Sequence, residues 1–312
     1  MSKVRVCFLG TPEFAVTCLR ALLDDEHYEV VGVVTQPDRP AGRKLQLTPS
    51  PVKSLAQARG LRVVAPESLK DNQLIVDEIA RWGAEVAVVV AFGQILKQSF
   101  MDLFHFGCVN VHASLLPRWR GAAPIQRAIE AGDGETGVCL QKMVRKLDAG
   151  DVIGERRVKI PDDMDSLQLH DQLAFLGADM LRVELMDYVR GNLGPHAQDE
   201  SLVTYAKKIE KSESVLDWSR PAKELHDKVR AFVWGPGTHT TLNGKRLKIH
   251  KTRVVSGEGH PGEILRVGEN ELVVATGRGA LEILELQPES RNRLSVADFL
   301  KAQPLKAGLA LG

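Results

Sequence analysis

The sequence predicts an α/β fold with a doubly wound, mostly parallel sheet, followed by a smaller β-barrel. Apolar β-rich runs alternate with helical stretches through the first half of the chain, the pattern of a sheet with helices on both faces. Residues 85–91 are almost wholly apolar, as expected for a strand that is covered on both faces. After Leu216 the pattern changes to short strands separated by turns, which is typical of a small barrel.

The elements of the first half are predicted in order along the chain. The first strand, residues 4–9, leads into a helix with Thr11 as its N-cap and Pro12 in its first turn. Residues 35–51 show no periodicity and predict a long loop, which in a compact domain is usually functional or mobile. The remaining predictions are strands at residues 29–35, 61–65, 85–91 and 108–111, and helices at 52–59 and 69–82.

The second half is predicted to complete the first domain and then form the barrel. Asn243-Gly244 lies between two alternating runs and predicts a hairpin. The boundaries that follow are a first domain at residues 1–190, a linker at 191–208 and a barrel domain at 209–312. The predicted helices are 122–131, 166–190 and 221–232, and the strands are 136–144, 152–160, 238–242, 247–250, 262–267, 271–275 and 281–286.

Length and composition describe a globular chain of two domains. The 312 residues exceed one ordinary core, and 44% hydrophobic with 26% charged residues excludes a disordered or fibrous class. No apolar run approaches the roughly 18–20 residues that span a bilayer, and no signal-peptide layout opens the chain. The four cysteines lack metal-binding spacing and are expected to be buried, reduced thiols. We therefore expect a cytoplasmic protein with no membrane partner and no metal.

Charge is distributed unevenly along the chain. Residues 1–200 hold 23 Lys and Arg against 27 Asp and Glu, whereas residues 201–312 hold 18 against 13. The basic excess is concentrated between Lys207 and Arg253, with 12 basic and 5 acidic residues. A basic C-terminal part that follows an acidic N-terminal part favours a polyanionic partner for the C-terminal part. A solvated charged surface without a partner is an equally good interpretation of the charge alone.

Two polar side chains, Asn110 and His112, interrupt the apolar strand at residues 108–111 and lie at its end. Residues two apart on a strand point to the same face, so an amide and an imidazole are presented together. Open α/β sheets bind ligands at the carboxyl ends of their strands. Taken alone, an asparagine that caps a turn and a hydrogen-bonded histidine remain alternatives. At this position the pair predicts a site.

Asp148 is the third candidate, in a small-residue loop after the strand predicted at 136–144. A carboxylate near His112 would favour the charged imidazole, orient the ring and accept a proton through water. Asn110 and His112 could then stabilise an oxyanion. An amide, an imidazole and an acid without a nucleophile suit direct acyl transfer to a substrate amine. For Asp148 alone, an ordinary turn aspartate is the alternative.

Several runs of residues resemble one known enzyme family in order and spacing. They are residues 10–15 (GTPEFA), 35–43 (TQPDRPAGR), 49–53 (PSPVK), 117–126 (PRWRGAAPIQ) and 202–206 (LVTYA). Asn110-x-His112, the turn at residues 114–117 and Asp148, 38 residues after Asn110, complete the pattern. These features resemble the formyltransferases that use 10-formyltetrahydrofolate, and the similarity spans nearly the whole chain.

The resemblance implies a Rossmann-like catalytic domain and an OB-like C-terminal domain that helps to bind tRNA. It implies formyl transfer from 10-formyltetrahydrofolate, without a metal, to the α-amino group of methionyl initiator tRNA in translation initiation. Asn110, His112 and Asp148 occupy the positions of the family's catalytic residues. The implied folate site comprises Ser114, Leu115, Leu116, Pro117, Phe92 and Gly93. The predicted tRNA contacts are Arg43 and Lys44 in the 35–51 loop, and Lys207, Lys208, Lys245, Arg246 and Lys248.

Two other functions remain open at this point. A formyltransferase that acts on a small amine would share Asn110, His112 and Asp148 but would not need a basic C-terminal domain. A folate- or RNA-binding module without catalysis would not need all three residues. No interface signature is evident in the sequence, so a monomer is expected.

Overall fold

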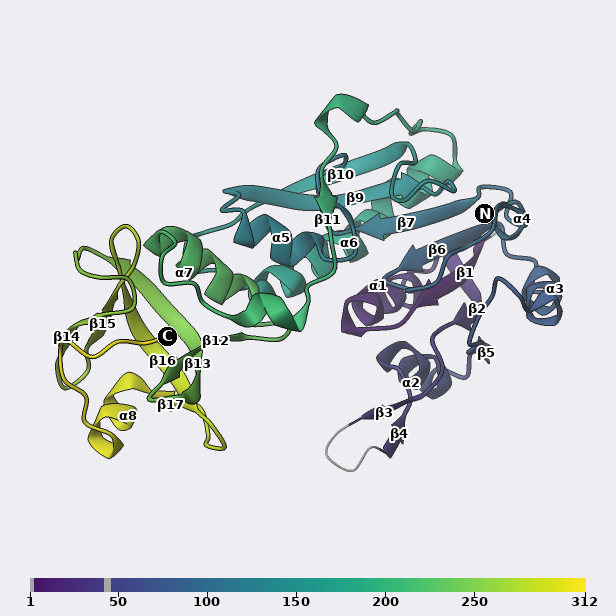
Figure 1. The fold of residues 1–312 in the computed structure, drawn as a ribbon. Helices are drawn as coiled ribbons and strands as arrows, with labels where there is room; N and C mark the ends of the chain where they lie inside the picture. Colours follow the sequence, from purple (N-terminus) through teal and green to yellow (C-terminus); the bar gives the residue numbers. More distant parts are fainter. Residues whose placement is uncertain (1–2, 42–45) are drawn as a thin grey trace. The chain divides into compact units, whose positions relative to one another are not determined.

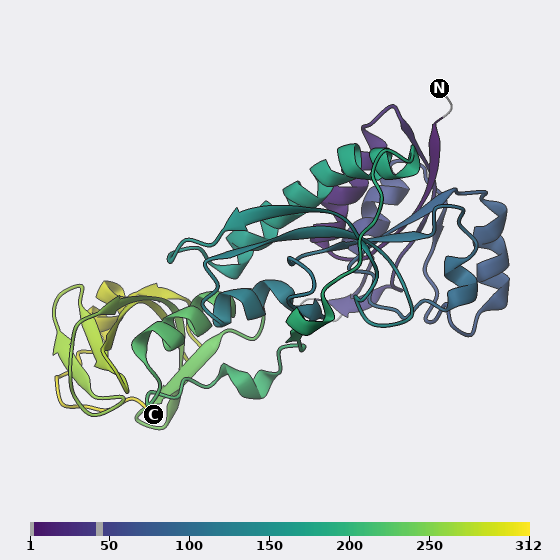
Figure 2. The same cartoon turned by 90° about the horizontal axis from the view of Figure 1, so that it is seen from above.

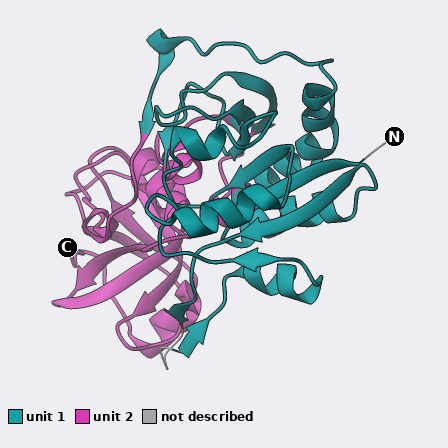
Figure 3. Ribbon diagram, turned by 90° about the vertical axis from the view of Figure 1, so that its right-hand side faces the viewer, with its two compact units in different colours: residues 1–121, 136–158, 170–205 teal, residues 122–135, 159–169, 206–312 magenta. Residues whose placement is uncertain are grey.

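The computed structural model describes residues 3–41 and 46–312, which form two compact units (Figure 3). Unit 1 comprises Met1–Gly121, Thr136–Val158 and His170–Tyr205. Unit 2 comprises Ala122–Glu135, Lys159–Leu169 and Ala206–Gly312. Each unit is therefore assembled from segments that are distant in the sequence.

Unit 1 is built on a seven-stranded sheet with the order β10-β9-β7-β6-β1-β2-β5 (Figure 1). The strands from β7 to β5 pair in parallel, whereas β9 runs antiparallel to β7. The mostly parallel sheet predicted from the sequence is thus confirmed. The strand bounds are β1 (Val4–Gly10), β2 (Tyr28–Val34), β5 (Val63–Val64), β6 (Val86–Val90), β7 (Cys108–His112), β9 (Glu135–Lys142) and β10 (Val152–Lys159).

Helices cover both faces of this sheet, as the apolar strands require. On one face runs α6 (Ser166–Val189) (Figure 2). A Cβ built on Gly177 of α6 would lie 2.7 Å from a methyl group of Val111 and 3.7 Å from Cys18 Sγ, so α6 packs on β7 and on α1 (Glu13–Leu23). On the other face, α3 (Gln73–Arg81) and α4 (Gln98–Met101) pack with alternate residues of β1 and β6.

Two local predictions in unit 1 were wrong. Thr11 does not cap α1: Pro12 is the N-cap residue, and Thr11 Oγ1 donates a hydrogen bond to the carbonyl oxygen of Phe92 at 3.3 Å. Residues 35–51 are not one continuous loop, because they contain the short strands β3 (Arg39–Ala41) and β4 (Gln46–Thr48) before α2 (Pro51–Ala58). Strands of three residues are too short to show an alternating pattern. Arg43 and Lys44 lie outside the described residues.

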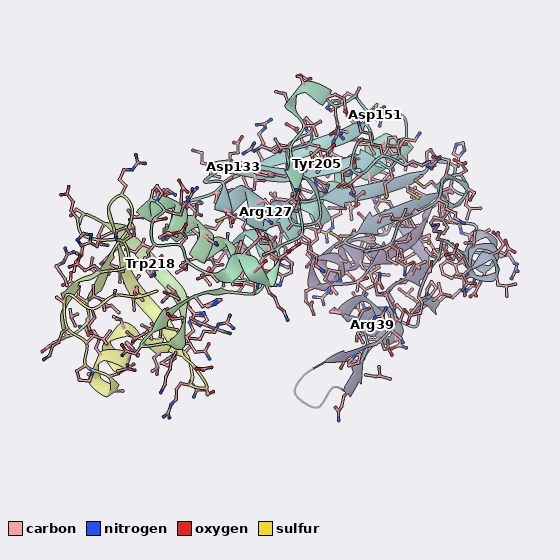
Figure 4. The ribbon with its side chains drawn as sticks, in the orientation of Figure 1. Arg39, Arg127, Asp133, Asp151, Tyr205 and Trp218 are labelled. Atoms are coloured by element: carbon pink, nitrogen blue, oxygen red, sulfur yellow. The ribbon has the colours of Figure 1, made fainter. Side chains whose placement is uncertain are left out.

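Unit 2 contains an antiparallel sheet with the order β12-β13-β16-β15-β14, and β17 pairs with β16. Asn243 and Gly244 have φ angles of 52° and 73°, so the predicted hairpin between β12 and β13 is confirmed. The hydrophobic core of unit 2 contains Trp218, which Figure 4 labels. Trp218 Nε1 donates a hydrogen bond to Thr240 Oγ1 at 3.0 Å. The bounds are α5 (Pro124–Glu130), α7 (Ala222–Ala231), β12 (Thr238–Leu242), β13 (Lys245–Val255), β14 (Ile264–Val267), β15 (Leu272–Ala275), β16 (Ala280–Pro288), β17 (Leu294–Ser295) and α8 (Val296–Ala302).

A short two-stranded sheet pairs β8 (Arg120–Gly121) with β11 (Tyr205–Ala206). It was not predicted, and neither were α4 and α8. The predicted fold class is nevertheless confirmed, because a mostly parallel α/β unit is accompanied by an antiparallel β unit. Across the described part of the chain, no helix is both long enough and apolar enough to cross a membrane.

Candidate active site

Strand β7 places Asn110 and His112 on one face of the unit 1 sheet. β7 lies between β6 and β9, and its residues alternate across the sheet. Across the β7–β9 pair, Asn110 faces Gln141 and His112 faces Cys139. The His112 side chain is only 6% exposed and Asn110 is half-buried. The amide and the imidazole are therefore held by a strand, with the precision that a packed sheet provides.

The turn after β7 fixes the orientation of the imidazole. Trp119 adopts a φ of 63°, which is rare for a bulky residue. In this conformation its carbonyl oxygen lies 3.0 Å from His112 Nε2. A carbonyl oxygen only accepts, so Nε2 carries the hydrogen of this bond. The turn is itself held by Ser114, whose buried hydroxyl donates to the carbonyl oxygen of Arg118 at 2.6 Å.

Asp148 faces the other nitrogen of the imidazole. Its Oδ2 lies 3.9 Å from His112 Nδ1, which is longer than a direct hydrogen bond and makes the interaction electrostatic. The carboxylate is 13% exposed. Oδ2 accepts a hydrogen bond from the backbone N–H of Gly121 at 2.8 Å, and Oδ1 accepts one from Gln141 Nε2 at 3.1 Å. These two bonds fix both carboxylate oxygens of Asp148, with Oδ2 turned toward the imidazole.

The structure thus brings together the three residues that the sequence singled out. His112 Nδ1 and Asp148 Oδ2 lie 3.9 Å apart, and Gln141, the β9 residue opposite Asn110, donates to Asp148 Oδ1. Chemically, the arrangement offers an amide donor, an imidazole that can be charged, and a fixed carboxylate. It suits the stabilisation of a developing oxyanion together with proton transfer. The roles of the three residues remain predictions.

Three contributors to the site were missed in the sequence. Gln141 follows the apolar run Val138–Leu140 of β9 and is itself buried, so the polar interruption that identified Asn110 could also have identified Gln141. The N–H of Gly121 and the carbonyl group of Trp119 belong to the backbone. Backbone groups leave no side-chain signal in a sequence, so only the fold reveals them.

The residues of the predicted folate site lie at the ends of β6 and β7. Leu116 is buried against Cys139 and Val152, whereas Leu115 is half-buried and packs close to Gly137. Pro117 follows a cis peptide bond. These contacts fix the turn between β7 and β8, and the predicted contact of this turn with folate stays a prediction.

Phe92 and Gly93 fix the path of the chain as it leaves β6. The Phe92 side chain is 3% exposed and belongs to the sheet core. Its carbonyl oxygen accepts hydrogen bonds from Thr11 Oγ1 and from Gln36 Nε2, the latter at 3.0 Å. Gly93 has a φ of 80°, a conformation that glycine adopts readily. Any contact of Phe92 with a ligand would thus use its backbone.

The predicted tRNA-binding residues of unit 2 lie on two elements. Lys207 and Lys208 are exposed after β11, and their carbonyl oxygens accept hydrogen bonds from the guanidinium of Arg127, which Figure 4 labels. Lys245 and Arg246 are exposed at the start of β13. The segment after β11 and the start of β13 thus both present cations to solvent.

Arg246 and Lys248 lie on the same face of β13, because they are two residues apart on a strand. His239 of β12 is the cross-strand partner of Lys248, and Arg246 lies 3.1 Å from its Nδ1. Burial and the charges of Arg246 and Lys248 lower the pKa of His239. This hairpin therefore carries a locally positive surface.

Unit 2 also has a partly open cavity of about 640 Å³, lined among others by Lys223, Arg230 and Asp162. Lys223 pairs with Asp162 and with Asp227, and Arg230 also pairs with Asp227. Because these charges neutralise each other, we assign no anion site there. Within residues 3–41 and 46–312, no group of three or more His, Cys, Asp or Glu is arranged to hold a metal ion.

Comparison with known proteins identifies the family. The family profile described as Formyl transferase matches residues 3–184, and that described as Formyl transferase, C-terminal domain, matches residues 208–304. A protein of Bdellovibrio bacteriovorus named Methionyl-tRNA formyltransferase is 70% identical over 317 residues, covering all of both chains. A protein of the same name from Methylococcus capsulatus is 50% identical, covering 99% of this chain and all of the relative.

Solved structures share the fold at low sequence identity. HypX from Aquifex aeolicus in complex with tetrahydrofolic acid has a TM-score of 0.67 at 18% identity, over 98% of this chain and 49% of HypX. The sugar 3N-formyl transferase WlaRD has a TM-score of 0.67 at 19% identity, over 94% of this chain and all of WlaRD. With a family profile matched over more than half of its length and full-length relatives at high identity, the chain belongs to the formyl transferase family.

Proposed function

We propose that this chain transfers the formyl group of 10-formyltetrahydrofolate to the α-amino group of methionyl initiator tRNA, and so acts in translation initiation. The observation that carries the proposal is the full-length similarity to relatives named Methionyl-tRNA formyltransferase, at 70% and 50% identity. This similarity includes the basic C-terminal part, residues 201–312, which a small acceptor would not require. Tetrahydrofolic acid bound to the related fold of HypX supports a folate donor.

In the proposed reaction, the neutral amine attacks the formyl carbon, and three side chains of unit 1 each have a separate role. The Asn110 amide donates to the formyl oxygen as negative charge develops there. Protonated His112 stabilises the same oxygen, and the Trp119 carbonyl group orients the imidazole ring of His112. Asp148 stabilises the positive charge of the His112 ring and supports the proton shuttle. A C–N bond forms to the amine, the C–N bond to folate N10 breaks, and the amine proton passes to N10.

The basic residues of unit 2 would bind the tRNA backbone. Phosphate contacts from lysine and arginine supply most sequence-independent affinity for nucleic acid. We assign this role to Lys207, Lys208, Lys245, Arg246 and Lys248, together with Arg43 and Lys44 of unit 1. One chain carries both the candidate catalytic residues and the basic segments, so we propose that it acts as a monomer. Because translation takes place there, we place its activity in the cytoplasm.

Formyl transfer to competing acceptors tests this function. Purified protein is given 10-formyltetrahydrofolate and, separately, charged initiator methionyl-tRNA, free methionine, glycinamide ribonucleotide or dTDP-3-aminofucose. The last acceptor is included because it is bound to a related N-formyltransferase from Helicobacter canadensis (TM-score 0.66, 18% identity, 90% of this chain and 98% of that one). We expect formylated product on the tRNA alone. Product on a small amine alone would show that the acceptor is a small molecule and not tRNA. Folate binding without any product would contradict the proposed formyltransferase activity.

A further inference from the structure

Asp148 lies on a loop whose backbone is held from outside the sheet. Its φ of 45° is uncommon for a residue other than glycine, although aspartate tolerates it better than most. Such a conformation persists where the surroundings determine it. The hydrogen bonds from Gly121 and Gln141 hold the carboxylate, but they do not act on the backbone of the loop.

Gln198 binds the backbone of this loop from a distant segment of the chain. It lies in the connector between α6 and β11, residues 190–204. Its Nε2 donates to the carbonyl oxygen of Asp148 at 2.8 Å and to that of Gly150 at 2.6 Å. Figure 4 labels Asp151 and Tyr205, which stand just after this loop and this connector in the sequence. One side chain thus spans the loop on both sides of Ala149.

Arg120 fixes the orientation of Gln198. Its side chain is fully buried, and its Nε and one terminal nitrogen donate to Gln198 Oε1 at 3.0 and 2.8 Å. A guanidinium can only donate and the two loop carbonyls can only accept, so the amide has one possible orientation. Arg120 in turn is paired with Glu200 at 2.7 Å. With Lys146, it lowers the pKa of Glu200 to about 2, so this anchor stays ionised at neutral pH.

The connector also holds the turn that orients His112. Thr204 Oγ1 accepts a hydrogen bond from the backbone N–H of Trp119 at 2.9 Å, and the Thr204 carbonyl oxygen accepts one from the N–H of Arg120. Trp119 is the residue whose carbonyl group binds His112. The same short segment therefore reaches both members of the His112–Asp148 pair, although it lies 50 residues beyond Asp148 in the sequence.

We propose that Gln198, oriented by the buried Arg120, is a positioning residue that sets the place of the Asp148 carboxylate against His112. This inference rests on the proposed role of Asp148 in formyl transfer. Gln198 does not touch the reacting atoms. Its contribution is to hold a strained loop in the one arrangement in which the carboxylate faces Nδ1 of the imidazole.

Substitution at Gln198 followed by steady-state kinetics tests the proposal. Gln198→Glu keeps an acceptor for Arg120 but removes both donors to the loop, so the fold is retained while the loop is released. Gln198→Met, of similar volume, removes all of these bonds and serves as the second variant. Gln57→Glu is the matched control, because it adds the same charge at an exposed glutamine of α2. Asp148→Asn provides the reference for loss of the carboxylate itself.

We expect both Gln198 variants to lose about 10- to 100-fold in kcat, since small displacements of a catalytic group have effects of this size. The KM values for folate and for methionyl-tRNA should stay near wild type, because binding groups are untouched. Gln57→Glu should match wild type. Wild-type kcat in the Gln198 variants, or a raised KM at unchanged kcat, would overturn the positioning role. An inactive wild type would reject the proposed function, and an active Asp148→Asn would reject the role of Asp148.

Discussion

His112 Nε2 donates a hydrogen bond to the main-chain carbonyl oxygen of Trp119, 3.0 Å away, so the imidazole presents its other nitrogen, Nδ1, to Asp148. The bond depends on the unusual backbone conformation of Trp119, with a φ of 63°. The turn after β7 therefore decides which nitrogen of His112 faces Asp148.

This relationship predicts the tautomer of His112. In the neutral ring the hydrogen should reside on Nε2, because the carbonyl oxygen of Trp119 cannot donate. Two-bond ¹H–¹⁵N correlation spectra of the protein with ¹⁵N-labelled histidine measure this directly, with His112→Asn identifying the resonance. A neutral ring with its hydrogen on Nδ1 would show that the Trp119 bond does not form in solution.

The salt dependence of the two KM values should differ. Binding of a polyanion releases counterions, so the KM for methionyl-tRNA should rise steeply with ionic strength while the KM for folate barely changes. Removing the exposed cations by Lys245→Ala and Arg246→Ala should lower the slope of log KM against log salt by about 1 for each phosphate that is no longer neutralised. Lys301→Ala, at an exposed position of α8, is the control. Equal insensitivity of both KM values would count against tRNA as the acceptor.

The stability of unit 2 should fall as the solution becomes mildly acidic. His226 is hydrogen-bonded to the Asp162 carbonyl oxygen and to Thr252 Oγ1, and burial lowers its pKa below the ordinary 6.5. Below that pH the unfolded chain binds a proton that the folded chain does not, so the free energy of unfolding decreases until the folded pKa is reached. His239 and His250 shift in the same direction.

His226→Gln tests this contribution, because an amide can replace both hydrogen bonds without titrating. Thermal unfolding followed between about pH 7 and about pH 5 should show a smaller loss of stability in this variant than in wild type. The same loss in both proteins would mean that His226 takes up its proton equally in the folded and unfolded chains.

The four thiols should be unreactive in the folded protein. Cys7, Cys18, Cys108 and Cys139 are all buried, and burial raises the pKa of Cys18, Cys108 and Cys139 to about 12 and that of Cys7 well above its ordinary value. The thiolate is the reactive species, so a disulfide reagent at mildly alkaline pH should modify none of them. All four should react in guanidinium chloride. Rapid modification of any thiol in the native protein would contradict its burial.

Strand periodicity carried the sequence-based prediction of the site. Asn110 and His112 share a face because alternation along a strand is geometric. Asp148 was predicted because it follows a strand expected at the same edge of the sheet, and that strand, β9, pairs with β7 in the structure. The hairpin between β12 and β13 was equally readable, since Asn243 and Gly244 tolerate the positive φ that its turn requires.

The rest depended on contacts between distant segments. Thr11 had the right chemistry for an N-cap but donates instead to Phe92, 81 residues away. Gln198 lies in a segment without periodicity, and only the folded chain brings it to Asp148. A sequence pattern reports on local geometry. Hydrogen bonds between residues that are 50 to 80 positions apart, such as those of Gln198 with Asp148 and Arg120, therefore leave no trace in it.

The central claim is that Asn110 and His112 stabilise the transition state of formyl transfer. The most direct measurement is kcat and KM for initiator methionyl-tRNA in wild type, Asn110→Ala and His112→Ala, after circular dichroism has shown that each protein is folded. We predict that kcat falls by about 10²–10³-fold in each variant, the usual effect of losing one oxyanion donor, while the KM for tRNA changes little. Near-normal kcat in both variants would contradict the assignment of this site.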